Sequence, residues 1–380
     1  MENLDPRLDS RPPLDAAVSR SHEKVDRVLP DAGEQPESVG PARLELDYLE
    51  RLHSSWEIDT PLVPPLAATM NVAARCDSHC LYCDKWRPGR LTEPGLPEII
   101  RVIGEAADLG VERLNLSGGE PLLRADLEDM IVEGSECGLA VGVLTNGRTL
   151  TESRLYRLRE AGLSFVWLSL DCLDRGLYSR LRGVPPGEAF SALEDVARLQ
   201  KESPGFFATV LAVLSKPNLP HVVDLVKECE RLGVRFQTQP IQVFSQGQRT
   251  GLMDQGVLLG RDDGPAVTRV AERIAKSPMS ICSTEYLDGM IQSLYGVCDN
   301  AAPCYAGYAM LNIDVRLDVR PCWPMPAVGS LRTASVREIW YSAAFSGARA
   351  RMRRHDCVGC HLLCHSERVR SLRWLIGVDS

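Results

Sequence analysis

Apolar segments typical of buried β-strands alternate with amphipathic helical segments from residue 66 to residue 244. The six strand-like segments read LAATMNVA, ERLNLS, LAVGVLT, FVWLSL, FFATVLAVL and RFQTQPIQVF. The helical segments lie near residues 97–109, 124–136, 151–161, 188–202 and 219–231. Such alternation predicts an α/β protein, a parallel sheet with helices outside it. Because six βα units are fewer than a complete eightfold barrel needs, we expect a partial (β/α)6 TIM-like barrel, with a doubly wound open sheet as the alternative.

Four polar motifs directly follow the first four of these strands. They are the cysteine loop ARCDSHCLYCDKW (74–86), SGGEP (117–121), TNG (145–147) and SLD (169–171). In parallel α/β proteins the carboxyl ends of the strands form the face that carries the active site. We therefore expect the four motifs to meet in one site at that face.

The cysteine loop carries three thiols, those of Cys76, Cys80 and Cys83, at the spacing C-x3-C-x2-C. Four thiolates close an iron-sulfur cluster or a structural zinc site, whereas three thiolates leave one iron open to another ligand. An open iron can bind a substrate or a cofactor. The alternative is a zinc site completed by His79.

The loop, with Tyr82 before its third cysteine, and the glycine pair of SGGEP together resemble the radical S-adenosylmethionine (SAM) enzymes. The resemblance covers roughly residues 66–370. It implies a [4Fe-4S] cluster on Cys76, Cys80 and Cys83, whose open iron binds the amino and carboxylate groups of SAM. Reductive cleavage of SAM would then give a 5′-deoxyadenosyl radical that abstracts hydrogen from the substrate.

The resemblance also implies a set of cofactor-binding residues. They are Tyr82, Gly118, Gly119, Glu120, Asn146, Ser169 and Arg182. Glycine at positions 118 and 119 would let the backbone approach the methionine part of SAM, which a β-carbon would obstruct. The glycine pair and the Asn146-Gly147 pair are also consistent with ordinary turns.

Ser169 and Arg182 are similar to a serine and an arginine that hold the ribose and carboxylate region of the cofactor in peptide-modifying and sulfatase-maturating members of the family. A guanidinium suits this place because it can bond both oxygens of a carboxylate. The interval between the two residues is one residue longer in this chain, so Arg180 is the alternative.

A second set of cysteines lies beyond the predicted barrel. Its members are Cys298, Cys304, Cys322, Cys357, Cys360 and Cys364. The segment MLNIDVRLDVRPC (310–322) predicts a β-hairpin, and a hairpin with distant cysteines resembles the twitch domain, the shorter relative of the SPASM domain. The resemblance implies one auxiliary [4Fe-4S] cluster, and structural zinc is the alternative. The preferred ligands are Cys304, Cys322, Cys357 and Cys360, with Cys364 and Cys298 as substitutes.

A full SPASM domain needs enough cysteines for two closed clusters, and six candidates are too few. Leu317 also stands where SPASM hairpins usually carry glycine. Both observations favour the twitch type.

Other residues bear on the reaction itself. Cys172 follows the fourth strand and is a candidate hydrogen donor, unless it is a small buried packing residue. Gln237 and Gln239 share one face of the sixth strand, where their amides would bond the hydroxyls of a sugar-like ligand. Plain polarity at a strand end is the alternative for both. Asp171 and Asp174 could attract the amino group of an amino-sugar, or Asp171 could cap the helix that follows.

These features divide the chain into four parts. We expect a disordered arm at 1–40, a docking helix at 41–62, the radical SAM partial barrel at 63–280 and the auxiliary cluster domain at 281–380. The arm is rich in Pro, Asp, Glu and Ser and has few large apolar side chains to offset the entropy of ordering. The docking stripe consists of Leu44, Leu46, Leu49 and Leu52.

The leading functional hypothesis is a dehydrogenase or epimerase that abstracts hydrogen from a carbinol carbon of an aminocyclitol or aminoglycoside, as in antibiotic biosynthesis. Radical modification of a ribosomal peptide is the second hypothesis, and a zinc-held binding protein without catalysis is the third. We expect a small polar substrate, an electron donor such as a flavodoxin or ferredoxin, and neither nucleic acid nor membrane as a partner.

Composition agrees with these expectations. A net charge of −8 argues against a general phosphate-binding surface. No apolar run approaches the length of a membrane span, and the polar start MENLDPRLDS does not fit a secretory signal. Thirteen cysteines in a reducing compartment favour metal ligands over disulfides. We therefore expect a cytoplasmic protein.

Overall fold

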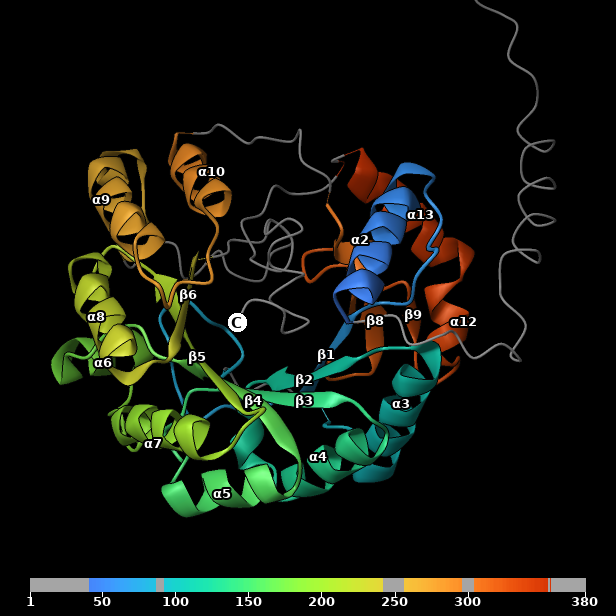
Figure 1. The fold of residues 1–380 in the computed structure, drawn as a ribbon, viewed down its shortest axis with the longest axis horizontal. Coiled ribbons are helices and arrows are strands. Elements are labelled where there is room, and N and C mark those ends of the chain that lie inside the picture. The colour runs from blue at the N-terminus through green and yellow to red at the C-terminus, as the bar shows by residue number, and fades with distance from the viewer. Residues whose placement is uncertain (1–40, 87–91, 242–255, 296–303, 355, 357–380) are drawn as a thin grey trace, which may run out of the picture. The chain divides into compact units, whose positions relative to one another are not determined.

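The computed structural model describes residues 41–86, 92–241, 256–295, 304–354 and 356. Figure 1 shows the fold, in which one curved sheet carries helices on its outer side. Six parallel strands build the main part of this sheet. They are β1 (Ala67–Ala73), β2 (Arg113–Gly118), β3 (Ala140–Thr145), β4 (Leu163–Ser169), β5 (Phe207–Leu214) and β6 (Arg235–Pro240).

The order of the strands decides between the two predicted architectures. The sheet runs β6-β5-β4-β3-β2-β1-β7-β8-β9, so the first six strands are neighbours in the order of the sequence. A doubly wound sheet would reverse its order near the middle. The expectation of a partial (β/α)6 barrel is therefore confirmed.

Helices connect the parallel strands on the outer side. They are α3 (Leu96–Leu109), α4 (Leu127–Glu136), α5 (Glu152–Glu160), α6 (Arg175–Arg182), α7 (Ala189–Glu202) and α8 (Val222–Leu232). Five of them lie where the sequence predicts helices, but α6 is additional. Three more short helices of the 3-10 type are η1 (Pro121–Leu123), η2 (Leu219–His221) and η3 (Arg261–Asp263).

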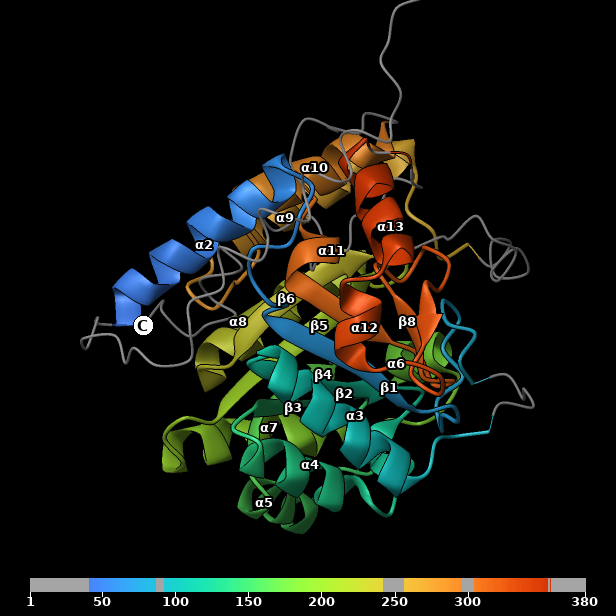
Figure 2. The same cartoon turned by 90° about the vertical axis from the view of Figure 1, so that its right-hand side faces the viewer.

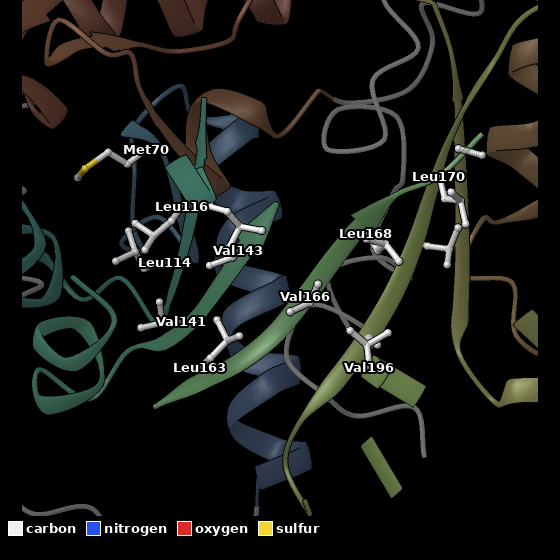
Figure 3. Close-up of a cluster of buried hydrophobic side chains, with 14 of the residues drawn as sticks. Met70, Leu114, Leu116, Val141, Val143, Leu163, Val166, Leu168, Leu170 and Val196 are labelled. Atoms are coloured by element: carbon white, nitrogen blue, oxygen red, sulfur yellow. The ribbon is translucent and has the colours of Figure 1, made fainter. Parts of the chain in front are cut away.

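The main hydrophobic core lies between the outer face of the sheet and these helices. Alternate residues of each strand supply it, as Figure 3 shows for Met70, Leu114, Leu116, Val141 and Val143. The other alternate residues face the inside of the barrel, and many of them are polar. The inner polar residues include Thr69, Asn71, Arg113, Asn115, Ser117, Ser169, Thr209, Arg235, Gln237 and Gln239.

The C-terminal strands extend the same sheet. Strand β7 (Met310–Ile313) pairs in parallel with β1, and β8 (Asp318–Arg320) and β9 (Gly329–Ser330) continue as antiparallel strands. The predicted hairpin is confirmed, and Leu317 in its turn has a positive φ of 65°, the conformation that favours glycine. The division into domains at residues 280 and 281 stays a prediction, because β7 joins β1 directly.

The remaining helices flank the two ends of the sheet. Figure 2 shows α11 (Ala306–Ala309), α12 (Val336–Trp340) and α13 (Ala343–Arg353) on the side of β1. At the other end, α9 (Gly264–Ala275) packs against α8 and α10 (Thr284–Leu294) packs against α9. No helix in the described part of the chain is long and apolar enough to span a membrane.

The predicted docking helix is present as α2 (Pro41–Glu57). Leu49 and Leu52 are buried among Val63, Leu66, Tyr308 and Met310. In addition, His53 Nδ1 lies 2.7 Å from Tyr305 Oη. The packing of these two leucines agrees with the predicted stripe, whereas the side chains of Leu44 and Leu46 lie outside the described part of the structure.

Candidate active site

The cysteine loop follows the carboxyl end of β1 and is attached to the end of α6. The amide of His79 donates to the carbonyl of Arg182 (2.8 Å), and the amide of Leu81 donates to the carbonyl of Leu181 (2.9 Å). These bonds place the thiol of Cys80 in the buried interior behind the loop, while the other two cysteines are half-buried. The loop is therefore fixed by backbone contacts that depend on none of its own thiols.

The sulfur atoms of the loop do not surround a single point. Within the described ranges, no three His, Cys, Asp or Glu side chains gather where one metal ion could bind. A cubane cluster has a different requirement, because each of its thiolates binds a different iron. The ring of His79, the fourth ligand of the zinc alternative, packs on Trp86 with 4.9 Å between ring centroids.

The two glycines of SGGEP lie against the backbone of the cysteine loop. A β-carbon on Gly118, whose φ is +130°, would lie 2.4 Å from the carbonyl oxygen of Ala73. A β-carbon on Gly119 would lie 2.0 Å from the carbonyl oxygen of Arg75. Both positions therefore require glycine in order to bring β2 and the loop together. Their predicted contact with a cofactor stays a prediction.

Glu120 joins the ends of β2 and β3 in the interior. Its Oε1 accepts hydrogen bonds from Thr145 Oγ1 (2.7 Å) and the amide of Leu122 (3.0 Å), and its Oε2 accepts one from the amide of Asn146 (2.8 Å). Burial raises the pKa of Glu120 to about 7, although these hydrogen bonds act in the opposite direction. The carboxyl group can therefore change its protonation state near neutral pH, and a nearby cation would favour the ionised form.

This raised pKa predicts that stability depends on pH through Glu120. Between pH 4.5 and about 7 the folded state keeps a proton that the unfolded state has released, so the free energy of unfolding falls as the pH rises. The loss is on the order of 3 kcal/mol across that window. Urea unfolding at several pH values, without added ligand, should show a smaller decline for Glu120→Gln than for the wild type. Equal declines would contradict the assignment.

Asn146 ties the end of β3 to the cysteine loop. Its Nδ2 donates to Asp77 Oδ1 (2.7 Å) and to Ser78 Oγ (3.1 Å). Arg148 supports the same loop, because its Nη1 donates to Asp77 Oδ2 (2.9 Å). Gly147 adopts a positive φ of 74°, so the TNG motif is a turn and also part of the site.

The structure separates the two candidate arginines. Arg182 is buried, and its Nε donates to Asp171 Oδ2 (2.8 Å) while its Nη1 lies 3.8 Å from Cys80 Sγ. Arg180 is exposed. The hydroxyl of Tyr82 also donates to Asp171 Oδ2. Arg182, and not its alternative, is therefore the arginine at the cysteine loop.

One network of hydrogen bonds thus connects the four motifs, as expected from their positions at the strand ends. Ser169 is half-buried on the inner face at the end of β4. Asp77 is central to the network but was not singled out from the sequence, whereas Asp171, considered there for an amino group or a helix cap, pairs with Arg182 and Tyr82. Helix α6 is capped by Asp174, whose Oδ1 accepts from the amide of Leu177 (2.6 Å), so the capping interpretation of Asp171 is wrong.

Cys172 lies in the hydrophobic core. Its side chain is fully buried, and its thiol donates to the carbonyl of Asp174 (3.5 Å). Burial raises the pKa of this thiol to about 12. The packing interpretation accounts for these contacts, and the role of hydrogen donor stays a prediction.

Two of the predicted auxiliary ligands pack into one small cluster. Cys322 and Cys304 both contact the group formed by Ala306, Met325, Ala348 and Met352. The other four candidates, Cys298, Cys357, Cys360 and Cys364, lie outside the described residues. Trp323 follows Cys322, and Lys85 Nζ of the cysteine loop lies 5.7 Å from the centroid of its ring. The two cysteine-bearing regions are therefore neighbours.

The residues present fit a cluster with a bound anionic ligand. Arg182 Nη2 is buried and has no hydrogen-bond partner in the described part of the chain. An unpaired buried donor is costly, so its place suits an acceptor that the protein itself does not supply. Three thiols on one loop, with the open guanidinium edge of Arg182 behind them, are the donor set that the predicted cofactors need.

Comparisons with known proteins agree with the resemblance found in the sequence. The model of the radical SAM superfamily matches residues 70–234. The PqqA peptide cyclase of Granulibacter bethesdensis is 27% identical over 295 residues, 76% of this chain and 75% of that protein. The PqqA peptide cyclase of Ruegeria pomeroyi is 29% identical over 310 residues, 78% of this chain and 80% of that protein.

Solved structures share the fold. SuiB of Streptococcus suis, bound to the precursor peptide SuiA, has a TM-score of 0.61 at 19% identity and covers 88% of this chain and 79% of its own. The anSMEcpe structure with bound AdoMet and the Kp18Cys peptide has a TM-score of 0.54 at 16% identity and covers 75% and 82%. Residues 70–234 of this chain are thus similar to the radical SAM superfamily, and the similarity to PqqA peptide cyclases extends over about three quarters of the chain. Its fold is the partial barrel with a C-terminal antiparallel hairpin that SPASM and twitch enzymes have.

Proposed function

We propose that the protein is a radical SAM enzyme that modifies a peptide by abstracting hydrogen from one of its carbons. The observation that carries the proposal is the match to PqqA peptide cyclases over about three quarters of both chains. The hypothesis that we ranked second from the sequence is therefore preferred to the carbohydrate hypothesis. The expected small polar substrate is replaced by a peptide.

The cofactors would be held by the network described above. Cys76, Cys80 and Cys83 would bind a [4Fe-4S] cluster, and Glu120 and Arg182 would contact the amino and carboxylate groups of SAM. When both are bound, the [4Fe-4S] cluster and SAM together would supply a radical that removes a hydrogen atom from the substrate. The protein's own residues orient the ligand and exclude water, because Glu120 and Arg182 are both almost fully buried.

The inner face of the barrel also suits a peptide. Its amide side chains include Asn71 and Asn115, which are buried, and Gln237 and Gln239, which are half-buried. Asn115 Nδ2 donates to Thr69 Oγ1 (3.0 Å), whereas Asn115 Oδ1 has no partner in the described ranges. Primary amides both donate and accept, as peptide groups do. These amides can therefore bond the backbone of a polypeptide.

An aminocyclitol is the second candidate substrate, because the same amide side chains can also form hydrogen bonds with hydroxyl groups. For either substrate, Cys304 and Cys322 would contribute to an auxiliary [4Fe-4S] cluster that accepts an electron from the substrate radical. The remaining ligands would come from Cys298, Cys357, Cys360 and Cys364. An electron donor such as a flavodoxin or ferredoxin would reduce the first cluster.

A direct assay distinguishes the two substrate classes. The anaerobically reconstituted enzyme is incubated with SAM, a reductant and either a pool of synthetic linear peptides or 2-deoxystreptamine, an aminocyclitol. We expect the peptide pool to raise the rate of 5′-deoxyadenosine formation above the substrate-free rate and to yield a peptide that has lost two hydrogen masses. Stimulation by 2-deoxystreptamine alone would overturn the proposal. The triple alanine variant of Cys76, Cys80 and Cys83 is the blank.

A further inference from the structure

A buried ion pair lies directly behind the cysteine loop. Arg182 Nε and Asp171 Oδ2 are 2.8 Å apart, and their side chains are 5% and 0% exposed. Asp171 Oδ2 also accepts from the hydroxyl of Tyr82, and Asp171 Oδ1 accepts from the amide of Val213 (2.9 Å). Donors therefore hold both oxygens, so the carboxylate cannot turn away from the arginine.

The other end of the guanidinium faces the loop. Arg182 Nη1 lies 3.8 Å from Cys80 Sγ, within hydrogen-bonding range for sulfur, and Nη2 has no partner among the described residues. Burial acts to lower the pKa of Arg182, but the charges of Asp171, Tyr82 and Cys80 raise it well above its usual value. A permanent positive charge thus contacts the most buried of the three thiols in the loop.

The backbone keeps this contact in place. The carbonyl of Arg182 accepts the amide of His79, and the carbonyl of Leu181 accepts the amide of Leu81. The arginine and the cysteine are therefore linked both through their side chains and through the main chain on either side of Cys80. Such a rigid arrangement lets a charge act on a thiolate at a constant distance.

We propose that the buried Asp171–Arg182 pair sets the reduction potential of the cluster on the loop, with Arg182 acting through Cys80. Reduction adds one electron and makes the cluster more negative, while no bond forms or breaks. A positive charge and a hydrogen bond at a ligand sulfur stabilise the more negative state and raise the potential. Asp171 acts in the opposite direction through its own charge, and it also positions the arginine.

The inference rests on the proposed role of Cys80 as a cluster ligand, but not on the identity of the substrate. Its test is a redox titration of the reconstituted protein with a low-potential reductant, followed by electron paramagnetic resonance, without SAM or substrate. A wild-type protein that binds no iron on this loop would overturn the proposed function and the inference together. A cluster that assembles normally, but whose reduction potential does not change when Asp171 or Arg182 is substituted, would overturn the inference and leave the proposed function in place.

Substitutions of the two partners, Asp171 and Arg182, should shift the reduction potential of the cluster in opposite directions. At the wild-type midpoint, Arg182→Met should lower the ratio of reduced to oxidised cluster about tenfold, which is 59 mV for one electron. Asp171→Asn should raise that ratio. A merely structural role would not give shifts of opposite sign, because both changes break the same buried pair and destabilise the fold in the same way. Shifts of the same sign, or none, would overturn the inference.

Two further variants complete the test. Arg175→Met removes an exposed arginine at the start of α6, and it should leave the potential unchanged. The double variant Asp171→Asn/Arg182→Met leaves no unpaired buried charge, so it should fold even if a single variant does not. Its potential should lie below that of Asp171→Asn, because only the double variant lacks the arginine. A potential equal to or above that of Asp171→Asn would overturn the inference.

Discussion

Alanine in place of Cys80 should remove about four irons per molecule from the reconstituted protein and abolish formation of 5′-deoxyadenosine. Cys80 is the buried member of the three-cysteine loop, and Arg182 contacts its sulfur. With only two thiolates left on the loop, a cubane cluster would have two open irons and would not be retained. Iron and sulfide quantitation, beside an assay of SAM cleavage, measures both effects.

Cys229→Ala is the matched control for this change. Cys229 is fully buried on α8 and belongs to the hydrophobic core, far along the chain from the loop. Its loss should cost about 1 kcal/mol of unfolding free energy through lost packing, and it should leave the iron content unchanged. A Cys80→Ala protein with the full wild-type iron content and SAM cleavage would remove Cys80 from the set of ligands.

The elements that local sequence patterns determine were predicted well. Each parallel strand carries apolar residues on its outer face, so its position follows from the pattern, and every strand begins within two residues of the prediction. The motifs follow the strands directly, and therefore their meeting at one edge of the sheet was also predictable. The structure confirms this for Glu120, Asn146 and Asp171, which bond to one another's motifs or to the cysteine loop.

Helix α6 was harder to predict from the sequence. Only Leu177, Tyr178, Leu181 and Arg182 of its eight residues are buried, so its apolar stripe is short. Asp174, directly before the first residue of the helix, is a residue type that commonly caps helices. Asp171, however, lies three residues earlier and carries the same side chain. Which of the two aspartates caps the helix and which one pairs with Arg182 depends on the fold of the cysteine loop. No local pattern contains that information.

The glycine pair shows a similar limit. The motif itself suggested a close approach of backbone to a ligand, yet the structure places both glycines against the loop that bears the cysteines. The sequence alone does not show whether a glycine is required by a contact between two chain segments or by a contact with a ligand. The contact distances show that Gly118 and Gly119 are required by the contact between β2 and the cysteine loop.

Gly119→Ala should lower both the cluster content and the stability of the protein. The new β-carbon would lie 2.0 Å from the carbonyl oxygen of Arg75 and 3.2 Å from the amide nitrogen of Cys76. The backbone cannot retreat easily, because the amide of Gly119 donates to Ala73 (2.8 Å) and the amide of Glu120 donates to Arg75 (2.9 Å). We expect a loss of about 3 kcal/mol in unfolding free energy and a displaced Cys76, measured by urea unfolding and iron quantitation.

Gly104→Ala is the control, because a β-carbon there meets no atom within 4 Å. This position lies inside α3, where alanine favours the helix by up to about 1 kcal/mol, so the control should be slightly more stable than the wild type. Opposite signs for the same chemical change would locate the effect in the contact between β2 and the cysteine loop. If Gly119→Ala instead kept the wild-type stability and iron content, the loop would not be held against β2 as described, and the site would need another explanation for its glycines.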